Sequence, residues 1–133
     1  MTSVKEYEFI EEIGHGTYGI VHKVRRRHGD NIQILVCKQI QLTAMKKPQR
    51  EHALQEAKLM SKFECPYIVK GYSSFIEDRF LNIIMEYCDS GDLESYIRRL
   101  DGERRQMLEE RIWSFFLQMA AGYEHFFIST NIF

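Results

Sequence analysis

The feature that most constrains the fold is a glycine-rich stretch near the start of the chain. Gly14, Gly16 and Gly19 lie close together between residues 12 and 21. Glycine has no Cβ, so it lets a backbone turn sharply or approach a ligand closely. The stretch therefore predicts either a loop whose backbone N–H groups surround an anion such as phosphate, or a glycine-rich hairpin turn that binds nothing.

The residues after the glycines narrow this choice. Residues 20–25 alternate between apolar and polar side chains, which predicts a strand and not a helix. A dinucleotide-binding loop needs a helix there and an acidic residue about 20 positions on, where this chain has Ile34. A Walker A loop is excluded because no Gly-Lys-Ser/Thr sequence follows at its spacing. A glycine loop between two strands is another known form of phosphate cover.

Composition predicts a globular protein and excludes several classes. The 133 residues suffice for one domain with its own core, and the net charge of −1 gives no basic excess for nucleic acid or an anionic membrane. No apolar run is long enough to span a bilayer, and the N-terminus lacks the apolar core of a secretion signal. The widely spaced Cys37, Cys65 and Cys88 favour reduced cytosolic thiols over disulfides or a zinc site.

Apolar periodicity and turn residues predict the remaining elements. Strands are expected at 7–13, 20–25, 32–40, 67–75 and 80–87, and helices at 49–63, 93–100 and 108 to about 126. Pro66 is expected to end the first helix and Asp92 to cap the second. The third helix carries an apolar stripe that predicts a core-facing side, formed by Ile112, Phe116, Met119, Tyr123 and Phe126.

Two charged residues stand out within these elements. Lys38 follows apolar residues in the third strand, where an unpaired buried ammonium is costly. It is either an edge lysine whose stem reaches solvent or a cation aimed at phosphates and held by a carboxylate. Glu56 lies on the apolar side of the first helix. It is a solvated rim residue, a partner for Arg50 or Lys58, or the partner of Lys38.

Several phrases together resemble a eukaryotic protein kinase, and more narrowly a NIMA-related (Nek-type) Ser/Thr kinase. They are residues 35–40, 56–63, 66–70, 74–75 and 85–93, and the resemblance runs from Tyr7 to about His125. It implies an α+β fold. Residues 7–87 would form the N-lobe, a five-stranded antiparallel sheet with one helix. Residues 88–92 would be the hinge, and residues 93–133 a partial C-lobe that begins with two helices.

The resemblance also implies roles for individual residues. The lid over the phosphates of ATP would comprise Ile13, Gly14, His15, Gly16, Thr17, Tyr18, Gly19, Ile20 and Val21. Lys38 would contact the α- and β-phosphates, and Glu56 would hold Lys38 in place. The adenine would contact Val21, Val36 and Met85, the last controlling access to a back pocket, together with backbone groups of Glu86 and Cys88. Asp92 would lie near the ribose or substrate.

The chain departs from the family pattern at two places. Gly71 stands where a large apolar residue is expected beneath the glutamate helix, which predicts a gap that loosens the helix. The His-Arg-Asp and Asp-Phe-Gly sequences that position the substrate and bind Mg²⁺ in kinases do not occur. Asn131 resembles the metal-binding Asn of the catalytic loop, although a tail residue without a role is the alternative.

Three hypotheses follow for the function of these residues. The first is an ATP- and Mg²⁺-dependent Ser/Thr protein kinase of which this chain is an incomplete part, inactive alone. The second is a pseudokinase-type module that binds nucleotide or a partner protein. The third is a poorly folded remnant, because the apolar stripe of the last helix is left for other residues to cover. The family implies a protein substrate and a cytoplasmic, cytoskeleton-associated location. The balanced charge and the lack of a long apolar run predict neither nucleic acid nor a membrane as partner.

Overall fold

The computed structural model describes residues 3–17, 19–28 and 31–130. Two of the predicted site residues, Tyr18 and Asn131, therefore lie outside the described residues. The chain divides into two compact units. The first contains residues up to 64 together with 69–87, and the second contains residues 65–68 together with those from 88 onward.

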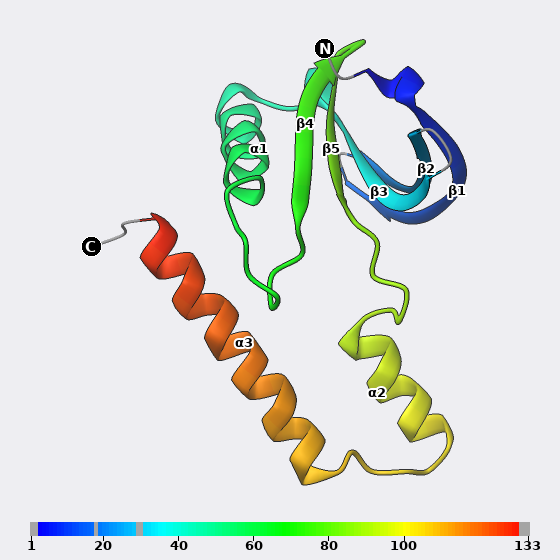
Figure 1. Cartoon of the computed structure of the whole chain (residues 1–133), viewed down its shortest axis with the longest axis vertical. Helices are drawn as coiled ribbons and strands as arrows, with labels where there is room; N and C mark the ends of the chain where they lie inside the picture. The colour runs from blue at the N-terminus through cyan, green and yellow to red at the C-terminus, as the bar shows by residue number, and fades with distance from the viewer. Residues whose placement is uncertain (1–2, 18, 29–30, 131–133) are drawn as a thin grey trace. The chain divides into compact units, whose positions relative to one another are not determined.

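The first unit is an antiparallel sheet with one long helix (Figure 1). The sheet has five strands in the order β1-β2-β3-β5-β4, and the helix α1 packs against β4. This confirms the predicted α+β sheet with one helix. The elements are β1 (Tyr7–Gly16), β2 (Gly19–His28), β3 (Asn31–Gln41), α1 (Lys47–Met60), β4 (Gly71–Glu77) and β5 (Phe80–Glu86).

Helix α1 begins and ends earlier than the sequence predicts. The rigid ring of Pro48 suits the first turn of a helix. There the Gln49 side chain accepts a hydrogen bond from the Lys46 N–H at 2.9 Å. The helix stops at Met60 rather than at residue 63. Ser61 caps this end, and its hydroxyl donates to the Lys58 carbonyl at 2.9 Å, which satisfies one carbonyl of the last turn.

The predicted fourth strand was wrong over its first four residues. Residues 67–70 are not part of a strand, and the Ile68 N–H bonds to the Cys65 carbonyl at 3.2 Å in a turn that contains Pro66. The strand β4 begins only at Gly71. The apolar residues of this segment favour a strand locally, but strand propensity depends on context and yields to the turn.

Apolar side chains pack on both faces of the sheet. Alternate residues of a strand point to opposite faces, so β3 contributes Ile40 to one face and Leu35 and Cys37 to the other. On the first face, the cluster joins the sheet to α1 and comprises Ile40, Leu42, Ala53, Ala57, Leu81 and Ile83. On the other face, the cluster comprises Tyr7, Val24, Leu35, Cys37 and Ile84. Both clusters hold the site-bearing strands in a fixed register.

One polar side chain is fully buried in the sheet. Asn82 is 0% exposed, and its Oδ1 accepts a hydrogen bond from Gln39 Nε2 at 2.8 Å. Its Nδ2 donates to the Phe80 carbonyl at 3.3 Å, so the cost of burying the amide is offset. The neighbouring Cys37 thiol has its pKa raised to about 12 by burial. An ionised thiolate is therefore strongly disfavoured there.

The second unit consists of helices α2 (Leu93–Gly102) and α3 (Glu109–Thr130). The predicted cap is confirmed, because the Ser95 N–H donates to Asp92 Oδ1 at 2.6 Å. The rings of Tyr96 and Phe115 meet edge to face at 6.0 Å between centroids and join the two helices. Neither helix, nor any other helix of the described residues, is long and apolar enough to cross a bilayer.

The apolar stripe of α3 does not face a core within this unit. The exposed fractions of Ile112, Phe116, Met119 and Tyr123 are 51%, 55%, 59% and 64%. The expectation of a core-facing side was therefore wrong for these four residues. The reason is that this unit contributes only α2 and a four-residue turn at 65–68, too little chain to cover a helix of 22 residues.

Candidate functional site

The glycine-rich stretch forms the tip of the hairpin between β1 and β2. Gly16 pairs with Gly19 at this tip. A Cβ at Gly19 would lie 2.2 Å from the Gln39 carbonyl oxygen, so only glycine lets the tip lie this close to β3. A Cβ at Gly14 or Gly16 would meet nothing closer than 3.4 Å. Gly19 is therefore needed for packing, whereas the other two glycines leave backbone accessible.

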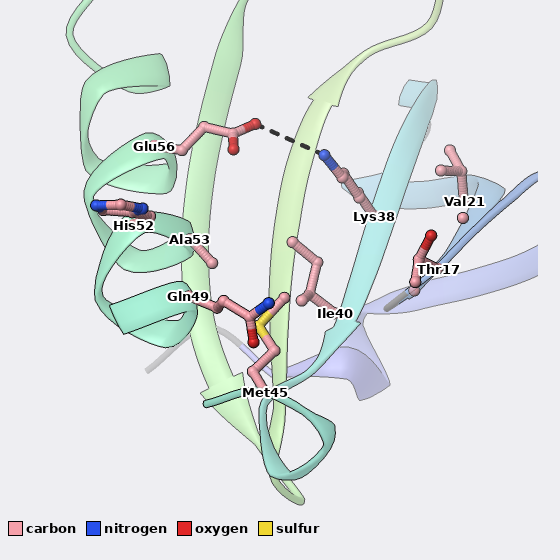
Figure 2. A pocket seen from close by; sticks show the side chains of 11 residues that line it. Thr17, Val21, Lys38, Ile40, Met45, Gln49, His52, Ala53 and Glu56 are labelled. Carbon is pink, nitrogen blue, oxygen red and sulfur yellow. Dashed lines mark ion pairs between the residues drawn. The ribbon is translucent and has the colours of Figure 1, made fainter. Parts of the chain in front are cut away.

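Lys38 and Glu56 face each other beside this hairpin. Figure 2 shows the two side chains extending toward one another from β3 and α1, and Lys38 Nζ lies 3.6 Å from Glu56 Oε1. Strand β3 is hydrogen-bonded on both sides, to β2 and to β5, so Lys38 is not an edge lysine. The side chains of Lys38 and Glu56 are 37% and 58% exposed. Solvent therefore screens the pair and leaves the lysine open to a ligand.

A cavity of about 460 Å³ opens between the hairpin tip and α1 (Figure 2). This volume lies within the usual range of small-molecule sites, about 300–1,000 Å³. Backbone from two glycines, one ammonium and one hydroxyl converge on it, which suits an anionic ligand. Its lining residues are Gly16, Thr17, Gly19, Val21, Lys38, Ile40, Met45, Gln49, His52, Ala53 and Glu56.

Helix α1 contributes cavity residues that the sequence analysis missed. Gln49 and His52 precede Glu56 by seven and four positions, so the three side chains lie along one side of the helix. This spacing was the available signal, since Glu56 was already singled out. Ala53, at the same side, is 7% exposed and lets the helix approach the sheet closely. This side of α1 therefore offers the cavity exposed polar side chains beside a buried alanine.

The residues predicted to contact adenine lie on the cavity side of the sheet. Val21 is paired with Lys38, and Val36 is paired with Met85. Because paired residues share a face and Val36 is two residues before Lys38, all four side chains project from the same face. The Glu86 N–H donates to the Lys70 carbonyl at 2.9 Å. Any backbone group that Glu86 offers to a ligand is therefore its carbonyl oxygen.

The remaining hairpin residues lie away from this cavity. His15 and Ile20 line a second hollow of about 310 Å³ on the opposite face of the sheet, together with Gln39 and Gln41. The His15 Nδ1 atom also lies 3.4 Å from Glu12 Oε1. Ile13 is 44% exposed, and neither it nor Gly14 lines either hollow. Of the predicted lid, the structure brings Gly16, Thr17, Gly19 and Val21 to the cavity.

Comparison with known proteins decides the family. The model of the protein kinase domain matches residues 7–133. The chain belongs to the protein kinase family. This kinase chain is 36% identical over 121 residues to the G2-specific protein kinase nim-1 of Neurospora crassa. That alignment covers 90% of this chain and 14% of the relative.

Two further relatives carry the Nek name. The kinase chain is 33% identical over 116 residues to the probable serine/threonine-protein kinase nek2 of Dictyostelium discoideum, an alignment of 86% of this chain and 27% of the relative. It is 34% identical over 109 residues to the serine/threonine-protein kinase Nek2 of Mus musculus, covering 80% and 24%. The predicted resemblance to NIMA-related kinases is confirmed. The chain spans about a quarter or less of the length of these relatives.

Two predicted nucleotide contacts of the kinase belong to the second unit. Cys88 is an exposed free thiol, and Asp92 is the N-cap of α2. The hydrogen bond from the Ser95 N–H lowers the pKa of the Asp92 carboxyl. Asp92 is therefore anionic at neutral pH, with one oxygen already used by the helix. Among the described residues no group of three His, Cys, Asp or Glu side chains could hold a metal ion.

The sequence analysis also missed Lys23, which contacts Tyr87, the last residue of the first unit. Lys23 Nζ lies 4.6 Å from the centroid of the Tyr87 ring and 3.4 Å from Glu11 Oε1. Its interactions with Tyr87, and then with Glu11, raise the pKa of the ammonium. Lys23 follows Val21 by two residues and so shares its face of the sheet, which is the signal that could have identified it. Its contact orients the ring of Tyr87, the residue that directly follows β5.

Proposed function

We propose that the first unit binds ATP, with its phosphates in the 460 Å³ cavity. The observation that carries this proposal is the ion pair of Lys38 and Glu56 at 3.6 Å directly beside the hairpin tip. A carboxylate that holds a lysine head fixes its direction and offsets its desolvation. The same lysine can then donate to phosphate oxygens while Glu56 holds its ammonium group in place.

The rest of the cavity fits the same ligand. Backbone N–H groups of a glycine-rich turn form anion-binding concavities, and Gly16 and Gly19 line this one. Val21 lines the cavity. Val36 and Met85 lie on the same face of the sheet but outside the cavity lining, and the three together offer an apolar surface that suits the flat adenine ring. Apolar walls with a few convergent polar groups are the usual composition of a small-molecule site.

For the whole protein to which these residues belong, we propose transfer of the ATP γ-phosphoryl group to Ser or Thr of a protein substrate. The names of the relatives support this reaction. In kinases the transfer depends on a catalytic-loop Asp and on metal-binding Asn and Asp residues, and the sequence contains neither His-Arg-Asp nor Asp-Phe-Gly. We therefore propose that these 133 residues bind ATP without transferring phosphate. Mg²⁺ accompanies ATP in the family, and its predicted ligand Asn131 lies outside the described residues.

A binding module without transfer activity is the second candidate. The intact pair of Lys38 and Glu56 favours it, since the pair positions phosphates whether or not transfer follows. The two candidates differ in what a longer kinase chain would do with bound ATP, and a protein partner belongs to both. A cytoplasmic location, with cytoskeletal association, is part of the proposal for the family.

Isothermal titration of ATP into the chain tests the proposed function. The Lys38→Met variant is expected to weaken ATP binding by about tenfold or more, because a hydrogen bond to a charged group contributes about 1.5–3 kcal/mol. Lys58→Met is the matched control, since Lys58 is exposed on α1 and does not line the cavity. Binding that is absent in the unmodified chain, or equal in both variants, would contradict the proposal.

A phosphoryl-transfer assay separates binding from catalysis. With radiolabelled ATP and a generic protein substrate, the chain is expected to bind nucleotide yet leave the substrate unlabelled. Transfer above the background of the Lys38→Met variant would show that the sequence holds a catalytic base that the family pattern does not identify. ATP hydrolysis without substrate labelling would likewise contradict a pure binding role.

A further inference from the structure

The first described residues of the chain are hydrogen-bonded to the far edge of the sheet. Ser3 Oγ donates to Glu77 Oε1 at 3.0 Å, and the Val4 N–H donates to Glu77 Oε2 at 2.7 Å. Residues 3–6 lead into β1, whereas Glu77 is the last residue of β4 (Figure 1). Strands β1 and β4 are the two edges of the five-stranded sheet. Residues 3–6 therefore form a clasp that joins the two edges at one end of the sheet.

The clasp also supports a strained turn. Asp78 and Arg79 connect β4 to β5 with φ values of 48° and 70°, which are unfavourable for residues that carry a side chain. Such a turn persists where its surroundings hold it. The clasp holds Glu77 on one side of the turn, and the Leu42 N–H bonds to the Arg79 carbonyl at 3.1 Å on the other. Release of Glu77 would therefore loosen the turn as well as the start of the chain.

Ser3 contacts two carboxylates. Its hydroxyl donates to Glu77, and its N–H donates to Glu6 Oε1 at 3.2 Å. The other Glu6 oxygen accepts a hydrogen bond from Arg26 Nη2 at 3.0 Å, so this guanidinium is already paired. The side chain of Lys5 belongs to an exposed residue. A negative charge added to Ser3 would therefore face two carboxylates that already hold their own partners.

We propose that Ser3 is a phosphorylation site and that a phosphoryl group there opens the clasp. In the reaction, which a Ser/Thr protein kinase catalyses, Ser3 Oγ bonds to the γ-phosphorus of ATP, the bond to ADP breaks, and the hydroxyl proton passes to the base of that kinase. The modified oxygen has no hydrogen left to donate to Glu77, and the phosphate carries a charge of about −2 at neutral pH. Repulsion from Glu77 and Glu6 then separates residues 3–6 from β4.

The effect is confined to one end of the first unit. Strand β1 stays paired with β2 from Tyr7 to Gly16, and Tyr7 is 7% exposed within the apolar cluster on that face. The sheet therefore remains folded while the clasp and the turn after Glu77 gain freedom. The proposal does not depend on the ATP site, because neither Ser3 nor Glu77 lines the 460 Å³ cavity.

Hydrogen–deuterium exchange in the full 133-residue chain tests the clasp. When Ser3 carries a phosphoryl group, the Val4 amide is expected to exchange at least about tenfold faster, because a hydrogen bond to a charged group is lost. A phosphoryl group on Ser74 is the matched control. Ser74 is exposed, and it points to the opposite face of β4 from Glu77, three residues away. This control should leave the exchange of Val4 unchanged.

A charge reversal shows whether the effect is electrostatic. In the unmodified chain, Glu77→Lys is expected to speed the exchange of Val4, because its acceptor is removed. In the chain phosphorylated on Ser3, the same substitution is expected to slow that exchange, because an ammonium group pairs with the phosphate. Ser3→Ala removes only the hydroxyl bond and should have a smaller effect than the phosphoryl group. An equal effect of Glu77→Lys on both forms of the chain would contradict the proposal.

Three other results would overturn the assignment. The first is unchanged exchange of Val4 after phosphorylation of Ser3. The second is faster exchange that extends to fully buried Ile84 of β5, since the whole sheet and not the clasp would then have opened. The third concerns the site itself. Mass spectrometry of the chain purified from eukaryotic cells is expected to find phosphate on Ser3, and its absence there would contradict a role as a phosphorylation site.

Discussion

The two units of the chain differ in how far their large apolar residues are buried. In the first unit, Leu81, Ile83 and Ile84 of β5 are at most 2% exposed. In the second unit, Phe116 and Leu117 of α3 are 55% and 62% exposed. Burial of apolar surface is the main force that fixes one structure. The first unit therefore has the means to hold a site in a defined geometry from its own residues.

This difference explains where the candidate site lies. Lys38 is placed by a strand between two others, and Glu56 by a helix that rests on the core of the same unit. The second unit offers an apolar groove of about 420 Å³ along α2 and α3 without a polar group in its lining. Such a groove can bind an apolar surface, but it has no group that would orient a nucleotide.

The largest expected difference concerns two cysteines, one in each unit. Burial raises the pKa of Cys37 to about 12, so its reactive thiolate is scarce at pH 8. Cys88 is exposed. Timed alkylation with iodoacetamide, read by mass spectrometry, should modify Cys88 at least about a thousandfold faster, given the thiolate requirement. Comparable rates would show that the core of the first unit opens readily.

Truncation of a core residue gives the next largest effect. Ile84→Ala removes a fully buried side chain from β5 and is expected to lower the free energy of unfolding by about 3 kcal/mol. The matched change in the second unit is Ile128→Ala, at a residue 67% exposed, with an expected change below about 0.5 kcal/mol. Denaturant unfolding measures both. Equal losses would mean that the two units do not differ as described.

The sequence predicted the sheet well because its signals are local. Alternating side chains, the glycine-rich hairpin and the turn before β5 each act over a few residues. The helical order of Gln49, His52 and Glu56 was equally readable, although only Glu56 was used. The strand predicted at 67–70 failed because an apolar composition cannot reveal that the chain around Pro66 turns back on itself.

Other features depended on contacts through space. Lys38 and Glu56 were each ambiguous alone, and only the packing of α1 on the sheet decides that they pair. Gly71 was read as a gap, because the sequence does not show that the Met60 backbone fills it. The stripe on α3 was read as core, because periodicity identifies an apolar side but not what covers it.

A buried amide offers a sharper test of the order in the first unit. Asn82→Ala leaves the Gln39 amide without its partner at 2.8 Å in the sheet and is expected to cost about 2 kcal/mol of unfolding free energy. Ser74→Ala on the neighbouring β4 is the control, at an exposed position. Thermal or denaturant unfolding measures the difference. A loss no greater than that of the control would show that the buried amide network does not order the sheet.

The smallest expected effect lies at the start of α2. The hydrogen bond from the Ser95 N–H lowers the pKa of Asp92, so its cap stabilises the helix above the ordinary carboxyl pKa. This contribution is lost as the pH falls below about 4 and through the lowered pKa. An asparagine side chain caps a helix without titrating, so Asp92→Asn should lessen the loss of helical circular dichroism at acid pH. An identical acid transition in both chains would contradict the assignment.

Selective chemistry at Lys38 tests the central claim most directly. An ATP analogue with an acyl phosphate transfers its acyl group to an amine that lies beside the bound phosphates, and peptide mapping identifies the modified lysine. The account predicts acylation of Lys38, prevented by excess ATP, with exposed Lys58 modified slowly and without protection. Equal acylation of both lysines, unaffected by ATP, would contradict a phosphate site at the pair of Lys38 and Glu56.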